Sequence, residues 1–129
     1  MNQEELNKIL RKHRLWLNNE IGGEKAVLDH TDLRGLNLYG ATLDEASLVN
    51  TLLRAADLTR ASLIIANLSG CDLKNAEMKK TDICGANLKG ANLSSANLYK
   101  AAYDKYTIFP DDFDVEGDHR MYKVVELYV

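Results

Sequence analysis

The sequence has little of what many small folds use to fix their shape. Its 129 residues include one proline, two cysteines and one tryptophan, and it has no apolar run long enough to cross a membrane as a helix. Two cysteines do not suggest a disulfide framework, so a reduced, cytoplasmic protein is expected. The first apolar residues alternate with Lys8, Arg11, Lys12 and Arg14, so no secretory signal peptide is expected either.

An excess of one charge is also missing from most of the chain. The formal net charge is −3. Residues 26–105 contain equal numbers of acidic and basic side chains, and the net negative charge comes from residues 106–129. Aromatic residues are rarely interleaved with the basic ones, so we do not expect direct nucleic-acid binding.

What the sequence does have is a repeat of five residues. Every fifth residue from 28 to 103 is large and apolar, and a small residue stands two positions before each of them except where Leu36 takes that place. A strand would give a period of two and a helix a period of 3.6, so neither explains this pattern. The large residues are Leu28, Leu33, Leu38, Leu43, Leu48, Leu53, Leu58, Leu63, Leu68, Leu73, Met78, Ile83, Leu88, Leu93, Leu98 and Tyr103.

This period predicts a chain that bends after every five residues. Residues two apart in an extended segment point to the same side, so the small and the large apolar residue both face inward. The next two residues must turn the chain, and residues that tolerate turns stand there, such as Gly35, Gly40 and Asn50. Such a chain coils on itself, and the coils must stack because one unit alone cannot bury its apolar side.

The repeat resembles the A-(D/N)-L-x-x signature of the pentapeptide repeat proteins. Units 56–60 (ADLTR), 86–90 (ANLKG) and 91–95 (ANLSS) carry it, and the resemblance covers residues 26–105. It implies an all-β fold, a right-handed quadrilateral β-helix with four units per coil and about four coils. We expect one structural domain in three parts, which are a capping helix with a Gly-Gly linker (1–25), the β-helix (26–105) and a capping tail (106–129).

The N-terminal segment is expected to be an amphipathic helix over about residues 3–19. Asn2 can cap its start, and Gly22 and Gly23 can end it. One interpretation is a lid on the first coil, and the other is a basic helix that docks on a partner or an anionic surface. His13 lies on the apolar stripe and is expected to be a packed core residue.

The tail is aromatic at first and then strand-like. We expect Ile108 to keep the five-residue phase, and Phe109, Phe113 and Met121 to cover the last coil. Residues 121–129 have strong strand propensity and could pair with the coil edge or with a second chain. A homodimer through this tail therefore stays open.

The sequence shows no catalytic motif, so we expect no enzyme activity, no metal and no cofactor. Asp29 and His30 lie at the turn of the first coil, and Asp32 stands at the Asp/Asn position of the repeat, so a solvated surface is expected rather than a site. Residues 112–118 are rich in carboxylates, but Lys123 stands where a calcium loop needs its closing glutamate.

The candidate functional residues are surface residues that stacking would align in columns, with one member from each coil. Basic columns could dock an acidic partner, or their charges could simply be solvated or neutralised by adjacent carboxylates. The consecutive Ile64 and Ile65 are expected to be covered by the tail, and otherwise to form an interaction patch. The basic columns are Arg34, Arg54 and Lys74, and Arg60, Lys80 and Lys100; Tyr39 and Tyr99 share an aromatic column.

These features predict a non-catalytic scaffold that docks a macromolecular partner, most simply a protein, on the flat faces of the β-helix. Three alternatives stay open. Some pentapeptide repeat proteins imitate DNA and inhibit DNA gyrase, but that requires a negative face that the neutral repeat region lacks. A phage- or plasmid-type antagonist of a host defence protein fits the small size, and a structural homo-oligomer fits the strand-like tail. No membrane partner is expected.

Overall fold

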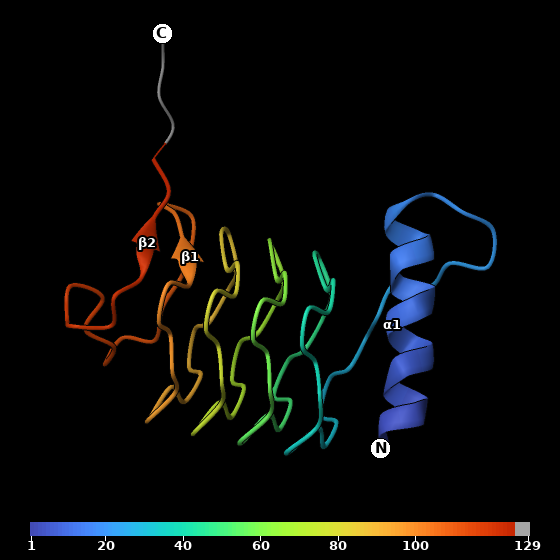
Figure 1. The fold of residues 1–129 in the computed structure, drawn as a ribbon, viewed down its shortest axis with the longest axis horizontal. Coiled ribbons are helices and arrows are strands. Elements are labelled where there is room, and N and C mark those ends of the chain that lie inside the picture. The colour runs from blue at the N-terminus through green and yellow to red at the C-terminus, as the bar shows by residue number, and fades with distance from the viewer. Residues whose placement is uncertain (126–129) are drawn as a thin grey trace, which may run out of the picture.

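The structure is a computed structural model that describes residues 1–125, in which a helix is followed by a stack of coils (Figure 1). Helix α1 spans Gln3–Leu17. The strands β1 (Ala102–Tyr103) and β2 (Tyr122–Lys123) pair in parallel at the other end of the stack. Between these elements, isolated parallel bridges connect one coil to the next.

The coils stack in a constant register. Parallel bridges join Val27 to Ser47, Asp32 to Leu52, and so on along the chain as far as Ala102. Each of these bridges spans four repeat units, so each coil has four sides. The bridges are made by the residue that stands between the small and the large apolar residue, which leaves that residue's side chain on the outside.

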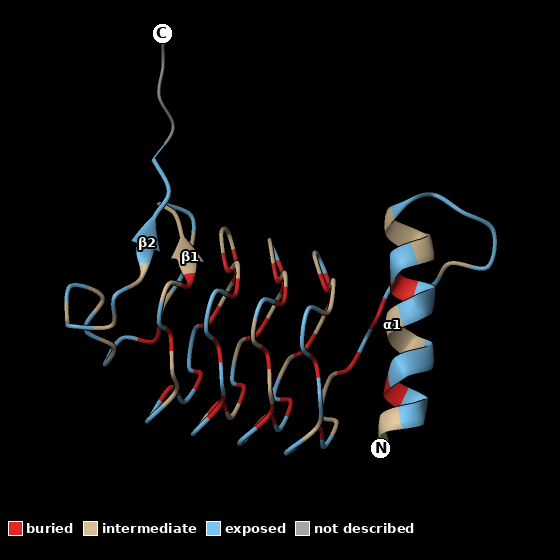
Figure 2. Ribbon diagram, viewed as in Figure 1, coloured by how far each residue is buried: buried red, intermediate tan, exposed pale blue. Residues whose placement is uncertain are grey.

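The large apolar residues of the repeat form the core. All of them from Leu28 to Leu98 are buried, and Tyr103 is partly buried. Figure 2 shows buried and exposed segments alternating along each coil. The buried hydroxyls of Thr51 and Thr81 each donate to a carbonyl oxygen at 2.7 Å. Among residues 1–125, no buried polar side-chain atom lacks a hydrogen-bond partner.

The Asp or Asn of the repeat closes the turn that follows it. Its Oδ1 accepts a hydrogen bond from the backbone N–H two residues later, for example from Tyr39 to Asn37 at 2.9 Å and from Thr59 to Asp57 at 3.0 Å. This local bond stabilises the bend and explains why these residue types recur at this position.

Two units with serine at this position take their acceptor from the preceding coil. Asp29 Oδ1 accepts from the Ser47 hydroxyl at 2.6 Å and from the Val49 N–H at 2.9 Å. In the same way, Asp44 Oδ1 accepts from the Ser62 hydroxyl and from the Ile64 N–H. The expectation that Asp29 belongs to a solvated surface is therefore wrong, because this half-buried carboxylate connects two coils.

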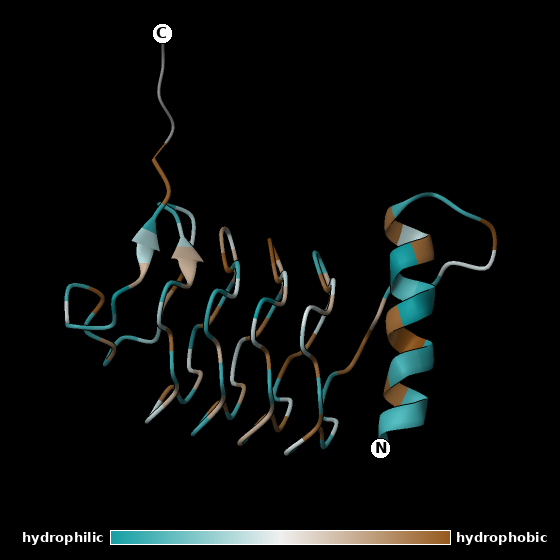
Figure 3. Cartoon of the chain, viewed as in Figure 1, coloured by the Kyte–Doolittle hydropathy of each residue, from teal (hydrophilic) through white to brown (hydrophobic). Residues whose placement is uncertain are grey.

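Helix α1 packs against the first coil. Asn2 caps its start by accepting from the Glu5 N–H at 2.9 Å, as predicted, while the helix ends at Leu17 rather than at residue 19. Leu6, Ile9 and Leu10 contact the core. In Figure 3, hydrophobic and hydrophilic segments alternate along α1, which is the pattern of a helix with one side packed.

His13 connects α1 to two separate coil segments. It is fully buried, as expected of a core residue. The Ala26 N–H donates to Nδ1 at 2.9 Å, and Nε2 lies 2.8 Å from the carbonyl oxygen of Asp44. A carbonyl oxygen can only accept, so the neutral ring with its hydrogen on Nε2 satisfies both bonds.

The five-residue phase breaks after Tyr103. Asn87 pairs with Ile108, one position further along the chain than the register of the earlier coils would place its partner. Thr107 takes the small inward position, where its hydroxyl donates to a carbonyl oxygen, and Ile108 is exposed. The expectation that Ile108 keeps the phase is wrong: three residues instead of two turn the chain here, so Phe109 packs against the core in its place.

The tail then returns to the edge of the last coil. Tyr122 pairs with Ala102 within the same chain, which is one of the two pairings that the sequence left open. Phe113 and Met121 pack against the core from outside. The end of the predicted strand, residues 126–129, lies outside the described residues.

Candidate docking surfaces

Exposed side chains of the repeat gather where the chain turns, and the turns of successive coils form continuous corners. At one corner, backbone N–H groups of one turn donate to backbone carbonyl oxygens of the turn on the next coil. These bonds run from Gly40 to Thr59, from Arg60 to Lys79 and from Lys80 to Tyr99. Two side-chain columns therefore share this corner. We name it the Tyr–Lys corner; its residues are Tyr39, Arg60, Lys79, Lys80, Tyr99 and Lys100.

The Tyr–Lys corner joins two predicted columns that are adjacent in the sequence, since Tyr99 directly precedes Lys100. Tyr39 is 57% exposed and Tyr99 is 39% exposed, and Lys100 Nζ lies 5.4 Å from the centre of the Tyr99 ring. The Lys100 N–H donates to the Arg120 carbonyl oxygen, so Arg120 extends the basic column by one coil. Sequence reasoning missed Arg120. The signal was available, because Lys80, Lys100 and Arg120 follow one another at the same spacing in the sequence.

Few carboxylates neutralise this corner. Among residues 1–125, Arg60, Lys80 and Lys100 form no ion pair. Lys79 lies 4.0 Å from Glu77, and both side chains are about half exposed, so this pair is weak. With stacked coils about 4.8 Å apart, the basic side chains are close enough to reinforce one another's positive potential.

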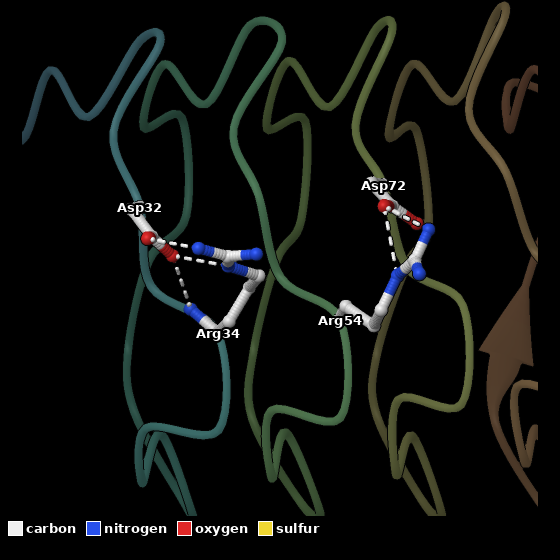
Figure 4. Close-up of polar contacts among 4 residues, drawn as sticks. All are labelled: Asp32, Arg34, Arg54 and Asp72. Carbon is white, nitrogen blue, oxygen red and sulfur yellow. Dashed lines mark hydrogen bonds and ion pairs between the residues drawn. The ribbon is translucent and has the colours of Figure 1, made fainter.

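The other basic column is largely neutralised (Figure 4). Arg34 donates from Nε and Nη2 to the two carboxylate oxygens of Asp32, at 2.9 and 2.7 Å. Arg54 reaches the next coil, where its Nη2 lies 2.9 Å from Asp72 Oδ2. Lys74 has no ion-pair partner among the described residues. This corner therefore presents much less free positive charge than the Tyr–Lys corner.

The Asp32–Arg34 pair predicts a measurable titration. Its hydrogen bonds lower the pKa of Asp32 from 3.8 to about 2. Because this pKa is depressed, the pair stays ionised as the pH falls through 4 and is lost only as the pH approaches 2. Replacing Arg34→Ala is expected to return the pKa of Asp32 toward 3.8, measured by NMR titration of the carboxyl carbon. An unchanged titration would show that the pair does not form in solution.

The Ile64–Ile65 pair is not covered by the tail. Ile65 is 63% exposed, so that expectation is wrong for this residue. The reason is that the tail pairs with Ala102 at the end of the stack and does not fold back along its side. Ile64 is partly buried. Ile65 also has a φ of +60°, a left-handed conformation that β-branched residues rarely adopt.

This strain predicts a stabilising substitution. Asn50 and Asn75 hold the same left-handed position in other units, with φ of +53° and +60°. Replacing Ile65→Asn is expected to raise the free energy of unfolding by about 1 kcal/mol, because asparagine tolerates this conformation. Urea unfolding measures the change. Ile65→Val is the control, since it keeps the β-branch and should gain nothing; a destabilised Ile65→Asn variant would show that the side chain contributes more than its backbone costs.

The part of the chain that the structure describes offers no obvious reactive centre. In residues 1–125, no three His, Cys, Asp or Glu side chains are placed to hold a metal ion. Cys71 is buried, and its thiol donates to the carbonyl oxygen of Leu48. The pKa of the Cys84 thiol is raised to about 12, mainly by its burial and secondly by the neighbouring carboxylate of Asp82. No helix within these residues is both long and apolar enough to cross a membrane.

The comparison with protein families agrees with the stacked register. The pentapeptide repeat pattern, in eight copies, matches residues 24–60, 52–90 and 66–101, which is more than half of the chain. The chain belongs to the pentapeptide repeat family. Proteins of this family are generally non-catalytic structural or binding proteins, and their fold is a right-handed quadrilateral β-helix.

Several solved pentapeptide repeat structures resemble this one. The protein alr5209 from Nostoc PCC 7120 has a TM-score of 0.50 and 26% identity over 88% of this chain and 93% of its own. HetL, involved in heterocyst differentiation regulation in Nostoc sp. strain PCC 7120, has a TM-score of 0.29 and 27% identity over 68% of this chain and 55% of its own. QnrB1, a plasmid-mediated fluoroquinolone resistance protein, has a TM-score of 0.36 and 14% identity over 79% of this chain and 67% of its own. Among curated proteins, none matches this chain.

Proposed function

We propose that this pentapeptide repeat protein is a non-catalytic scaffold that docks an acidic protein partner along the Tyr–Lys corner. The observation that carries the proposal is the meeting of two exposed tyrosines with Arg60, Lys80 and Lys100, which form no ion pair among the described residues. Tyrosine is enriched at protein interfaces and at their energetic centres. Positive charge along the corner would select an acidic surface and speed its association.

The corner is also rigid, which favours docking. Each of its turns is bonded through the backbone to the turn of the next coil, so little ordering is needed when a partner binds. Tyr39 and Tyr99 are separated by three coil steps, about 14 Å at the usual spacing between strands. A partner that contacts both tyrosines would therefore lie lengthwise along the β-helix.

Capture with two matched baits tests this proposal. One bait carries Arg60→Glu, Lys80→Glu and Lys100→Glu, and the other carries Arg34→Glu, Arg54→Glu and Lys74→Glu. Both change the charge by the same amount at corners of the same fold. A partner captured by the unmodified protein should be lost from the first bait and kept by the second. Loss from the second bait alone would place docking at the other corner and overturn the proposal.

The charge distribution does not support the DNA-mimic alternative. A DNA mimic needs a continuous negative surface, whereas the repeat region is neutral and its Tyr–Lys corner is positive. An antagonist of a host defence protein would be one form of the proposed scaffold, with its partner specified.

A further inference from the structure

The N-terminal end of the molecule has an open, shallow hollow of about 670 Å³ between α1 and the loop that follows it. Four basic side chains line this hollow, together with Leu15 and one carboxylate, Glu20. We name it the basic hollow. Its basic residues are Lys8, Arg11, Lys12 and Arg14.

The loop is held in place by close contacts with α1, so the hollow has a defined shape. A side chain at Gly23 would place its Cβ 2.3 Å from the backbone nitrogen of Trp16, so only glycine lets the chain approach the helix this closely. The Glu24 N–H donates to the Lys12 carbonyl oxygen at 3.0 Å. At the loop, Ile21 is fully exposed beside the hollow.

Most of the positive charge in the hollow is free. Lys12 lies 3.6 Å from Glu24, while Lys8, Arg11 and Arg14 form no ion pair among the described residues. Lys8 and Arg11 are one helical turn apart on the exposed side of α1. The hollow therefore suits a projecting segment that carries several carboxylates and some apolar surface.

The opposite end of the same molecule carries such a segment. In residues 112–116, acidic and apolar residues alternate, with Phe113 packed against the core and Asp112, Asp114 and Glu116 exposed. We name residues 111–118 the acidic loop. Figure 1 places α1 and the segment that contains this loop at opposite ends of the molecule. Among the described residues, Asp118 is the one member of the loop in an ion pair, with Arg120 at 3.6 Å.

We infer that the acidic loop of one copy binds in the basic hollow of the next copy, giving head-to-tail association. The basic hollow and the exposed carboxylates of the acidic loop complement each other in charge. Each contact uses different surfaces, at opposite ends of the molecule, so copies add head to tail into a filament, or into a ring where the rotation between copies closes it. The inference does not rest on the proposed function, since the Tyr–Lys corner stays free along such an array.

Sedimentation velocity over a range of protein concentrations tests this inference. The average mass is expected to rise with concentration at low salt and to fall toward the monomer at high salt, because exposed charges are screened. Arg11→Glu with Arg14→Glu reverses the hollow, and Asp112→Lys with Asp114→Lys reverses the loop. Each variant alone should associate at least about tenfold more weakly. All four positions are exposed, and circular dichroism checks that both variants fold.

Mixing the two variants provides the decisive comparison. The loop variant keeps an intact hollow and the hollow variant keeps an intact loop, so the mixture should regain the association that each variant alone has largely lost. Arg60→Glu with Lys80→Glu is the control and should associate like the unmodified protein. The inference is overturned if the unmodified protein stays monomeric, if association survives both reversals, or if the mixture regains nothing. Association that survives both reversals would instead point to pairing through the edge of β2.

Discussion

Replacing Leu68→Lys is expected to abolish the folded β-helix at room temperature. Leu68 is completely buried in the middle of the apolar column. A lysine there would place a charge without a partner in the core, which costs several kcal/mol, and such a loss approaches the whole stability of a small domain. Because each coil is stabilised by its neighbours, the loss should spread along the stack. Far-UV circular dichroism and urea unfolding measure the outcome.

Leu52→Lys is the matched control for this prediction. Leu52 is 38% exposed and lies on the outer side of its coil, bridged to Asp32 and Asp72 on the coils before and after. The same change of residue type should therefore leave the free energy of unfolding within about 0.5 kcal/mol of the unmodified protein. If both variants unfold, or if Leu68→Lys stays as stable as the unmodified protein, the assignment of inward and outward positions is wrong.

Replacing His13→Leu is expected to lower the free energy of unfolding by about 2–4 kcal/mol, because it leaves two buried backbone groups without partners. These groups are the Ala26 N–H and the Asp44 carbonyl oxygen. Leucine has a similar volume and suits the apolar side of α1, so the loss measures mainly the two hydrogen bonds. Urea unfolding, followed by the fluorescence of the single Trp16, gives the value and also reports whether α1 separates before the coils do.

His30→Asn is the control for the substitution of His13. His30 is exposed and has a φ of +56°, which asparagine tolerates, so its replacement should leave stability unchanged. A His13→Leu variant as stable as the unmodified protein would show that the two hydrogen bonds of His13 do not help to attach α1, which would then be held by its apolar contacts and by the two bonds between Gln3 and the Asn37 backbone.

The repeat could be predicted from the sequence because its cause is local. Each unit carries its own inward residues and its own turn, and an Asp or Asn such as Asp57 stabilises that turn through the backbone N–H of Thr59. The N-cap Asn2 is local in the same way. The break after Tyr103 could not be predicted, because Ile108 and Phe109 are both apolar and only the packing of the last coil decides which of them turns inward.

The candidate surfaces were less predictable, since they depend on how side chains reach between coils. The sequence places Arg54 in a basic column, but the partner that neutralises it, Asp72, lies on the next coil. That the two columns of the Tyr–Lys corner meet follows from the sequence, because Tyr99 directly precedes Lys100, but only the structure shows that Arg60, Lys80 and Lys100 form no ion pair among the described residues. A repeat therefore specifies its core through spacing alone, while its surface chemistry requires the stacked structure.

The most direct test of the docking scaffold is the dissociation constant for a purified partner, measured by calorimetry with the two charge-reversed triple variants. The variant with Arg60, Lys80 and Lys100 changed to Glu should bind at least about tenfold more weakly than the unmodified protein, and its binding should depend less on salt. The variant with Arg34, Arg54 and Lys74 changed to Glu should bind with little change. Equal affinities for all three proteins would contradict docking at the Tyr–Lys corner, as would a loss confined to the second variant.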